Sequence, residues 1–221
     1  MDCRLDQSTA PFQIDLTTHL AFGATHPKSN AFCLKFEHKR HLGRQDLRIL
    51  YLLGCNEGPS KRYRVFNHIE ALKTAGHHAE WIWDIHPQTR DRDFIASFSI
   101  VVNFRGGFND RSAPFFDLVK SLGIPLVYDT DDLVFDPSVV DQIDAYRRMA
   151  PPDQVDYLSG MRSMSRALIS AQYTTTSTSY LADYLEKYSR LKSWVIPFGV
   201  NDRQITLAGT SERPEGGLAR S

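Results

Sequence analysis

The stretch Ile124-Pro-Leu-Val-Tyr-Asp-Thr-Asp-Asp-Leu-Val-Phe-Asp136 decides the fold, because an apolar run leads directly into three closely spaced carboxylates. This pattern is typical of a buried parallel strand whose carboxyl end opens onto a crevice, which is where open α/β sheets bind ligands. Asp129, Asp131 and Asp132 are therefore the first candidates for chemistry. A plainer interpretation is that they only end the strand and cap the next helix, since Asp is favoured in turns and at N-caps.

Length and composition predict one full-sized hydrophobic core. The chain has 221 residues, of which 42% are hydrophobic, and this favours a single domain with tails. Lysine and arginine together number 26, as do aspartate and glutamate, so the formal net charge is zero. Because this balance gives no bulk attraction to polyanions, we expect no nucleic-acid partner.

Cysteine spacing and hydropathy indicate the compartment. Cys3, Cys33 and Cys55 are widely spaced and form no CxxC motif, which argues against a disulfide scaffold or a zinc site and favours a reducing compartment. The sequence shows neither a membrane-length apolar run nor a secretory signal pattern. We therefore expect a cytoplasmic protein without a bound metal, and peripheral contact with the inner membrane face remains open.

Strand and helix patterns alternate over residues 46–200 and predict an α/β fold, a Rossmann-like doubly wound parallel sheet. The predicted strands are 48–54, 80–83, 98–104, 124–128, 173–176 and 194–196, and the predicted helices are 62–75, 114–122, 179–188 and a long helical region before residue 173. Residues 1–45 lack a sustained period and predict an irregular N-terminal extension. Residues 201–221 contain several glycines and few apolar anchors and predict a linker or frayed tail.

Two glycine-containing turns follow predicted strands. The turn Gly54-Cys-Asn-Glu-Gly-Pro-Ser-Lys-Arg-Tyr-Arg64 opens a helix, whose N-terminal N–H groups and basic side chains favour a phosphate or sugar-phosphate group. Its spacing is neither a dinucleotide fingerprint nor a Walker loop, and an ordinary turn with surface arginines is the plainer interpretation. Arg105-Gly-Gly107 is either a close-approach loop with Arg105 facing an anion or a flexible turn.

The order of these segments carries a family resemblance. The segments are 48–54, 60–77, 125–136, 175–182 and 195–201, the last reading Val-Ile-Pro-Phe-Gly-Val-Asn. Together they resemble the N-terminal half of a GT-B glycosyltransferase of the family 4-like group, found in polysaccharide and O-antigen biosynthesis. The resemblance implies two facing Rossmann-like domains, in which the N-terminal domain mainly holds the acceptor and the C-terminal domain binds the nucleotide-sugar.

The chain departs from the family at two places. Phe198 stands where the family's linker carries asparagine, and only 20 residues follow Asn201 where the family has its donor-binding domain. The resemblance therefore implies an acceptor-side domain with a glycan or lipid-linked sugar acceptor as partner. A separate donor-domain chain would bring the nucleotide-sugar, which is a donor substrate, and no cofactor is expected. We expect the isolated chain to transfer no sugar.

The resemblance also implies site residues. Asp129 and Asp131 stand where many members carry a catalytic or acceptor-orienting residue, and a carboxylate there would deprotonate or orient the acceptor hydroxyl. Asp129-Thr-Asp131 also matches the DxD metal motif of the GT-A fold, but the GT-B-like order argues against a metal. The expected substrate-binding residues, which lie in the first loop, after the third strand and after the fourth, are Gly54, Arg62, Arg64, Arg105 and Asp132.

Two other functions compete with this hypothesis. The main alternative is a non-catalytic Rossmann-like module for binding or protein interaction, which would expose the face that a second domain covers. A receiver-like phosphoacceptor domain ranks lower, because it expects an acidic pair after the first strand, where this chain has Gly54-Cys-Asn.

Overall fold

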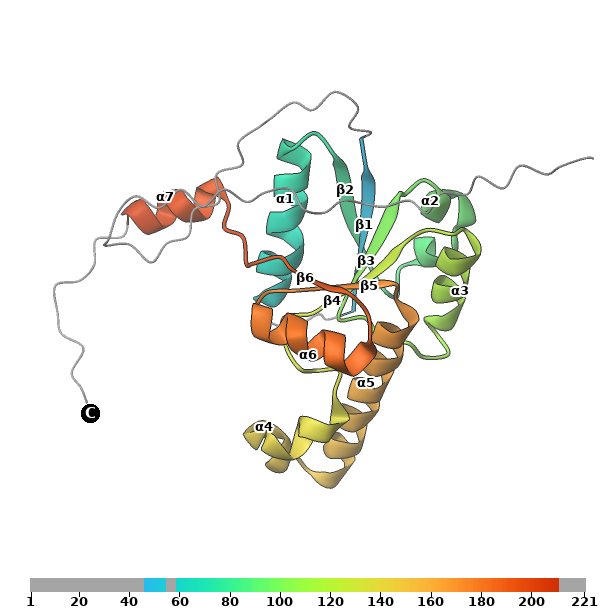
Figure 1. Ribbon diagram of the computed structural model, residues 1–221, viewed down its shortest axis with the longest axis vertical. Coiled ribbons are helices and arrows are strands. Elements are labelled where there is room, and N and C mark those ends of the chain that lie inside the picture. Colours follow the sequence, from blue (N-terminus) through green and yellow to red (C-terminus); the bar gives the residue numbers. More distant parts are fainter. Residues whose placement is uncertain (1–45, 55–58, 211–221) are drawn as a thin grey trace, which may run out of the picture. The chain divides into compact units, whose positions relative to one another are not determined.

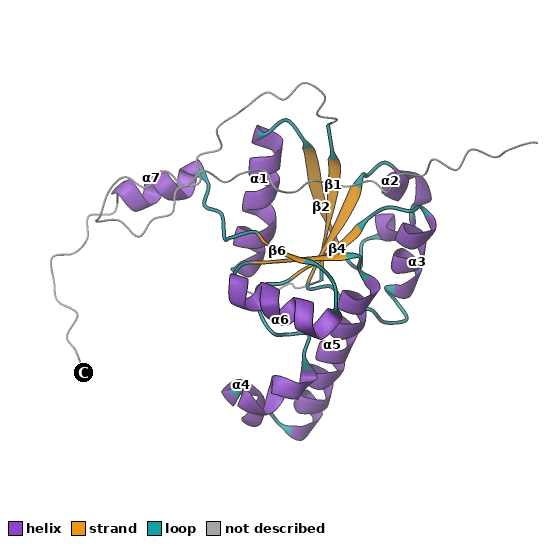
Figure 2. Ribbon diagram, in the orientation of Figure 1, coloured by secondary structure: helices purple, strands orange, loops and turns teal. Residues whose placement is uncertain are grey.

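The computed structural model describes residues 46–54 and 59–210, which form an α/β fold around a six-stranded, all-parallel sheet (Figure 1, Figure 2). The predicted irregular extension over residues 1–45 lies outside the described residues. The spatial strand order is β2-β1-β3-β4-β5-β6. The strands are β1 (Arg48–Leu53), β2 (His78–Trp83), β3 (Ile100–Phe104), β4 (Leu126–Asp129), β5 (Tyr173–Thr176) and β6 (Ser193–Val195). The predicted Rossmann-like parallel sheet is confirmed.

Helices connect successive strands, and local sequence signals set several of their ends. They are η1 (Arg62–Phe66), α1 (Asn67–Thr74), η2 (Pro87–Arg90), α2 (Arg92–Ala96), α3 (Ala113–Ser121), η3 (Pro137–Gln142), α4 (Asp144–Arg147), α5 (Pro151–Ser170), α6 (Ser179–Ser189) and α7 (Asp202–Thr210). Asp91 caps α2 and Thr178 caps α6 through their side chains. Gly76 and Gly123 adopt positive φ just after α1 and α3, a backbone conformation that glycine tolerates.

Each face of the sheet carries its own apolar core. Alternation along β1 sends Ile49, Tyr51 and Leu53 to one face, where they pack with Val65 and Ile69 of η1 and α1. Leu50 and Leu52 point to the opposite face, whose core is completed by residues of α2, α3, α5 and α6, including Ile95, Phe115, Leu168 and Leu185. The connection from β1 to β2 and the connections after β2 run in opposite directions along the sheet. Right-handed crossovers therefore place their helices on opposite faces.

The end of the described chain differs from the sequence prediction. We predicted a linker or frayed tail from Asn201, whereas α7 begins at Asp202. The Asn201 side chain accepts a hydrogen bond from the Gln204 backbone N–H, and the Gln204 side chain accepts one from the Asn201 N–H, at 2.9 and 3.0 Å. This reciprocal pair is a capping box, which starts a helix even in a glycine-containing segment.

Candidate functional site

The candidate site lies at the carboxyl edge of the sheet, where the strand order reverses between β1 and β3. Such a switch point opens the crevice in which doubly wound folds bind ligands. Leu53 pairs in register with Phe104, and Phe104 with Asp129, so the segments that follow these three strands begin at the same edge. The structure therefore brings together Gly54, the turn that starts at Arg105, and the Asp129–Asp132 segment.

Gly54 is required by packing between two turns. Its N–H donates to the Phe104 carbonyl at 3.0 Å. A Cβ at this position would lie 2.1 Å from the Gly106 Cα, far inside van der Waals contact. The glycine therefore lets the turns after β1 and β3 approach each other closely. This packing within the protein accounts for a glycine at position 54.

Arg105 organises the acidic end of β4. Its guanidinium Nη2 lies 2.5 Å from the Asp131 carboxylate and 3.7 Å from that of Asp132. The contact with Asp131 is an ion pair rather than an aligned hydrogen bond, because Asp131 Oδ1 and Arg105 Nε are both buried without a hydrogen-bond partner among the described residues. The side chain of Asp131 is 4% exposed and that of Asp132 is 66% exposed. Only Asp132 therefore presents its carboxylate openly to solvent.

The backbone of Arg105 is itself unusual. Its φ is 53°, in the left-handed region that side-chain-bearing residues avoid. Its N–H donates to the Asp129 carbonyl at 3.1 Å, which fixes the turn against β4. Strained backbone of this kind is often found at functional sites and is held by the surrounding structure.

Asp129 and Arg64 form a buried pair on the face of the sheet that α1 covers. The Asp129 carboxylate accepts from Arg64 Nε at 3.1 Å and from Arg64 Nη2, and the Thr175 hydroxyl donates to it at 2.7 Å. The Asp129 side chain is 2% exposed and that of Arg64 is 0% exposed. These contacts favour a positioning role for both residues, so catalysis by Asp129 and substrate binding by Arg64 stay predictions.

Arg62 lies apart from this cluster in its contacts. Its guanidinium pairs with Glu70 of α1 at 2.9 Å, with both side chains partly exposed. No described contact joins it to the acidic end of β4. Its predicted role in substrate binding therefore gains no support from the described contacts.

Sequence reasoning missed two polar residues at this edge. Thr175 pairs in register with Asp129, and strand alternation along Tyr173–Thr176 was the signal that places both on one face. Asp84 directly follows β2, and its N–H donates to the Leu53 carbonyl at 3.0 Å. Burial raises the pKa of Asp84, and the positive charge of Arg111 partly opposes the shift.

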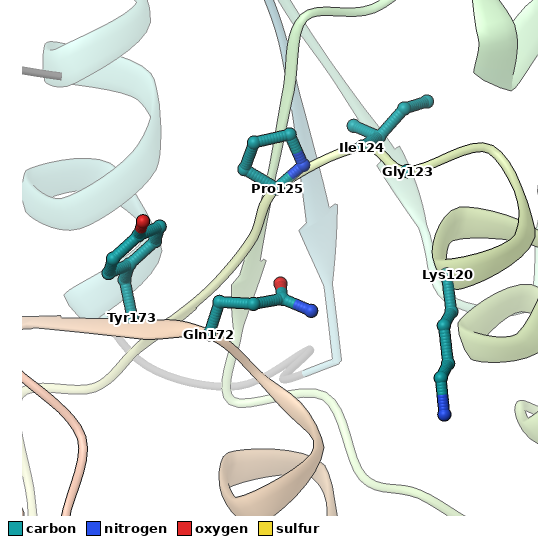
Figure 3. Close-up of a pocket in the computed structure, with 6 residues that line it drawn as sticks. All are labelled: Lys120, Gly123, Ile124, Pro125, Gln172 and Tyr173. Atoms are coloured by element: carbon teal, nitrogen blue, oxygen red, sulfur yellow. The ribbon is translucent and has the colours of Figure 1, made fainter. Parts of the chain in front are cut away.

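A small hollow lies at the opposite edge of the sheet. It encloses about 190 Å³ and is lined by Lys120, Gly123, Ile124, Pro125, Gln172 and Tyr173 (Figure 3). These residues surround the amino ends of β4 and β5, and the volume is below the roughly 300–1,000 Å³ of typical ligand pockets. The hollow is therefore a weaker site candidate than the carboxyl edge.

Neither a metal cluster nor a membrane span is found within residues 46–54 and 59–210. No group of three His, Cys, Asp or Glu side chains there is arranged to hold a metal ion. Among the same residues, no helix combines the length and the hydrophobicity that crossing a bilayer requires.

The sheet and its switch point define a parallel α/β protein of the Rossmann-like class. No family model matches the chain, and no curated protein does either. Among solved structures, the chain is similar to the crystal structure of a conserved protein from Enterococcus faecalis V583, at 13% identity and a TM-score of 0.27. That match covers 72% of this chain and 94% of the other. At this TM-score the similarity says nothing about function.

Proposed function

We propose that this chain is the acceptor-side domain of a glycosyltransferase that works together with a donor-binding domain. The observation that carries the proposal is the cluster of Arg105, Asp131 and Asp132 at the switch point between β1 and β3. A glycan or lipid-linked acceptor would enter this crevice, and a sugar would pass to its hydroxyl from a nucleotide-sugar. The protein would act in the cytoplasm, in reach of acceptors at the inner membrane face.

Asp132 would have a catalytic role, and Arg105 and Asp131 would have a structural one. Asp132 is the exposed carboxylate, so an acceptor hydroxyl reaches it first and transfers its proton there as the new glycosidic bond forms, while the bond from the sugar to the phosphate breaks and the nucleotide phosphate leaves. Arg105 and Asp131 form a less exposed ion pair next to it and hold the turn in place. A general base positioned in this way contributes about 10²–10⁴ to a rate.

A second domain would bind the donor. The described residues form one sheet, whose two faces are covered mainly by η1 and α1 on one side and by α2, α3, α5 and α6 on the other. Contacts to the nucleotide and pyrophosphate would therefore belong to the second domain, as in the GT-B arrangement that the sequence resembles. No resident cofactor takes part in this proposal.

One observation favours the non-catalytic alternative. Both oxygens of Asp129 and the whole guanidinium of Arg64 are used within the protein. If the aspartates at the end of β4 had only structural roles, the carboxyl edge of the sheet would bind a ligand without catalysing a reaction. The two functions differ in whether sugar transfer appears when a donor domain is added.

Acceptor binding tests the part that both functions share. Purified protein is applied to an array of bacterial surface oligosaccharides, alongside Arg105→Ala and the matched control Lys120→Ala, which changes the hollow at the opposite edge. We expect binding by the parent and by Lys120→Ala, and roughly tenfold weaker binding or less by Arg105→Ala, because that change removes the cation that pairs with Asp131 and Asp132 and holds their turn in place. Loss of binding in Lys120→Ala alone would move the site to the hollow and contradict the proposal.

A further inference from the structure

The chain that leaves β6 is held along η1 and α1 by side-chain hydrogen bonds. We call residues 196–204 the exit segment. Arg64 Nη1 donates to the Ile196 carbonyl, and Asn67 Nδ2 donates to the Gly199 carbonyl at 2.5 Å. The exit segment's Asn201 donates in turn to Glu70 Oε2 at 2.7 Å. Three side chains of one helical region therefore hold successive points of the exit segment.

Apolar burial contributes little to this attachment. Ile196, Phe198 and Val200 are 41%, 48% and 48% exposed. The Phe198 ring lies beside Tyr63 and over the Arg64 guanidinium, with 5.9 Å between the centres in each case. Since an element with few buried apolar contacts can open locally while the core stays folded, the exit segment can detach without unfolding the sheet.

Arg64 joins the exit segment to the candidate site. Its Nε and Nη2 bind Asp129 while its Nη1 binds the Ile196 carbonyl, so one rigid guanidinium makes both contacts. The Asp129 carbonyl in turn accepts from the N–H of Arg105. A shift of Asp129 at the end of β4 would move the Arg64 guanidinium. It would thereby move Nη1, which donates to the Ile196 carbonyl.

We propose that Arg64 is a latch for the exit segment, and that Asp129 is the positioning residue that sets it. The latch couples the end of β4, two residues before Asp131, to the direction in which the chain leaves the domain. The coupling is reciprocal, because release of the exit segment also frees the β4 end to shift. This inference does not depend on sugar transfer and holds equally for a binding module.

Hydrogen exchange measured by mass spectrometry on the full chain tests the latch. The readout is the exchange of the Ile196 amide, which donates to the Thr176 carbonyl, and of the Asn201 and Gln204 amides, which bond each other's side chains in the docked segment. Arg64→Lys keeps the charge but cannot make both contacts, and Asn67→Ala removes the two hydrogen bonds to Gly199 and Gln204 of the exit segment without touching the ion pair. We expect both variants to exchange these amides roughly tenfold faster or more, with β1 and β3 still protected.

The matched control is Asp136→Asn. Asp136 is a buried carboxylate that bonds Tyr184 and Ser138 instead of Arg64, so these amides should exchange in this variant as they do in the parent.

The outcomes separate the latch from a general loss of stability. Parent-like exchange of these amides in both Arg64→Lys and Asn67→Ala would overturn the proposal, as would an equal effect of Asp136→Asn. If Arg64→Lys unfolds the sheet, Thr175→Val replaces it, because that change removes one hydrogen bond from Asp129 and leaves both ions in place. Faster exchange of the exit segment in Thr175→Val would support the coupling to Asp129, and unchanged exchange would overturn it.

Discussion

Arg64 and Asp129, which are 65 residues apart in the chain, form a two-contact ion pair that is closed to solvent. Taking both charges out of water is costly, so the pair is stable only because its geometry and its other hydrogen bonds are good. Thr175 and the Ile196 carbonyl supply those further bonds. The pair thus links η1, β4, β5 and the chain beyond β6.

Removing one partner of this pair should strongly destabilise the protein. Arg64→Met leaves the Asp129 carboxylate buried without its counter-ion, and we expect a loss of about 3–5 kcal/mol in the free energy of unfolding. The double variant Arg64→Met/Asp129→Leu removes both charges and should lose less than the sum of the two single changes. Urea denaturation measures all three. Strict additivity of the single losses would show that the two side chains do not interact.

The close approach of the β1 and β3 turns gives a second prediction. Gly54→Ala places a methyl group 2.1 Å from the Gly106 Cα, and we expect it to cost about 1–3 kcal/mol, as overpacking does. Gly160→Ala in α5 is the matched control, because its Cβ would meet nothing within 4 Å. The control should gain about 0.5–1 kcal/mol from helix propensity. Thermal melts in which both variants behave alike would contradict the proposed packing of the two turns.

His68 should make stability depend on pH near neutrality. Burial lowers its pKa, the Arg64 charge lowers it further, and Asp129 and the Pro197 carbonyl oppose both effects only in part. Because the unfolded chain then binds the proton more tightly than the folded chain, the free energy of unfolding rises with pH. The penalty is absent well above pH 6.5 and grows as the pH falls through that value toward the folded pKa.

Melting temperatures measured between pH 5 and pH 8 check this prediction. The parent should lose stability on going to pH 5, and His68→Gln should lose less over the same range. A parent and a variant with parallel pH profiles would remove His68 as the source of the dependence.

The sequence predicted the sheet well because its strands are marked by local signals. Apolar runs such as Ile49–Leu53 end at glycine or at charge, and the observed strands fall on the predicted ones. Helix α7 was missed because one capping pair, Asn201 and Gln204, outweighed the glycine content. The helices η3 and α4 follow the acidic segment and lack the sustained apolar period that identifies longer helices.

The site was predicted only as far as position along the chain allows. Carboxyl ends of parallel strands meet at one edge, so Gly54, Arg105 and the aspartates could be grouped from sequence. Which carboxylate pairs with which arginine depends on tertiary geometry. Asp129 turns toward Arg64 and Asp131 toward Arg105, and no local pattern distinguishes these partners.

Sugar transfer in a reconstituted assay tests the central claim most directly. The chain is combined with a GT-B donor-binding domain, added in trans or fused after α7, and transfer from a nucleotide-sugar to acceptors that bind on the array is measured. Asp132→Asn is compared with Asp141→Asn, a change of an exposed aspartate in η3. We predict no turnover by the chain alone, turnover when the donor domain is present, and a loss of about 10²–10⁴ in rate for Asp132→Asn only. Turnover by the chain alone, or equal rates for Asp132→Asn and the parent, would contradict the account.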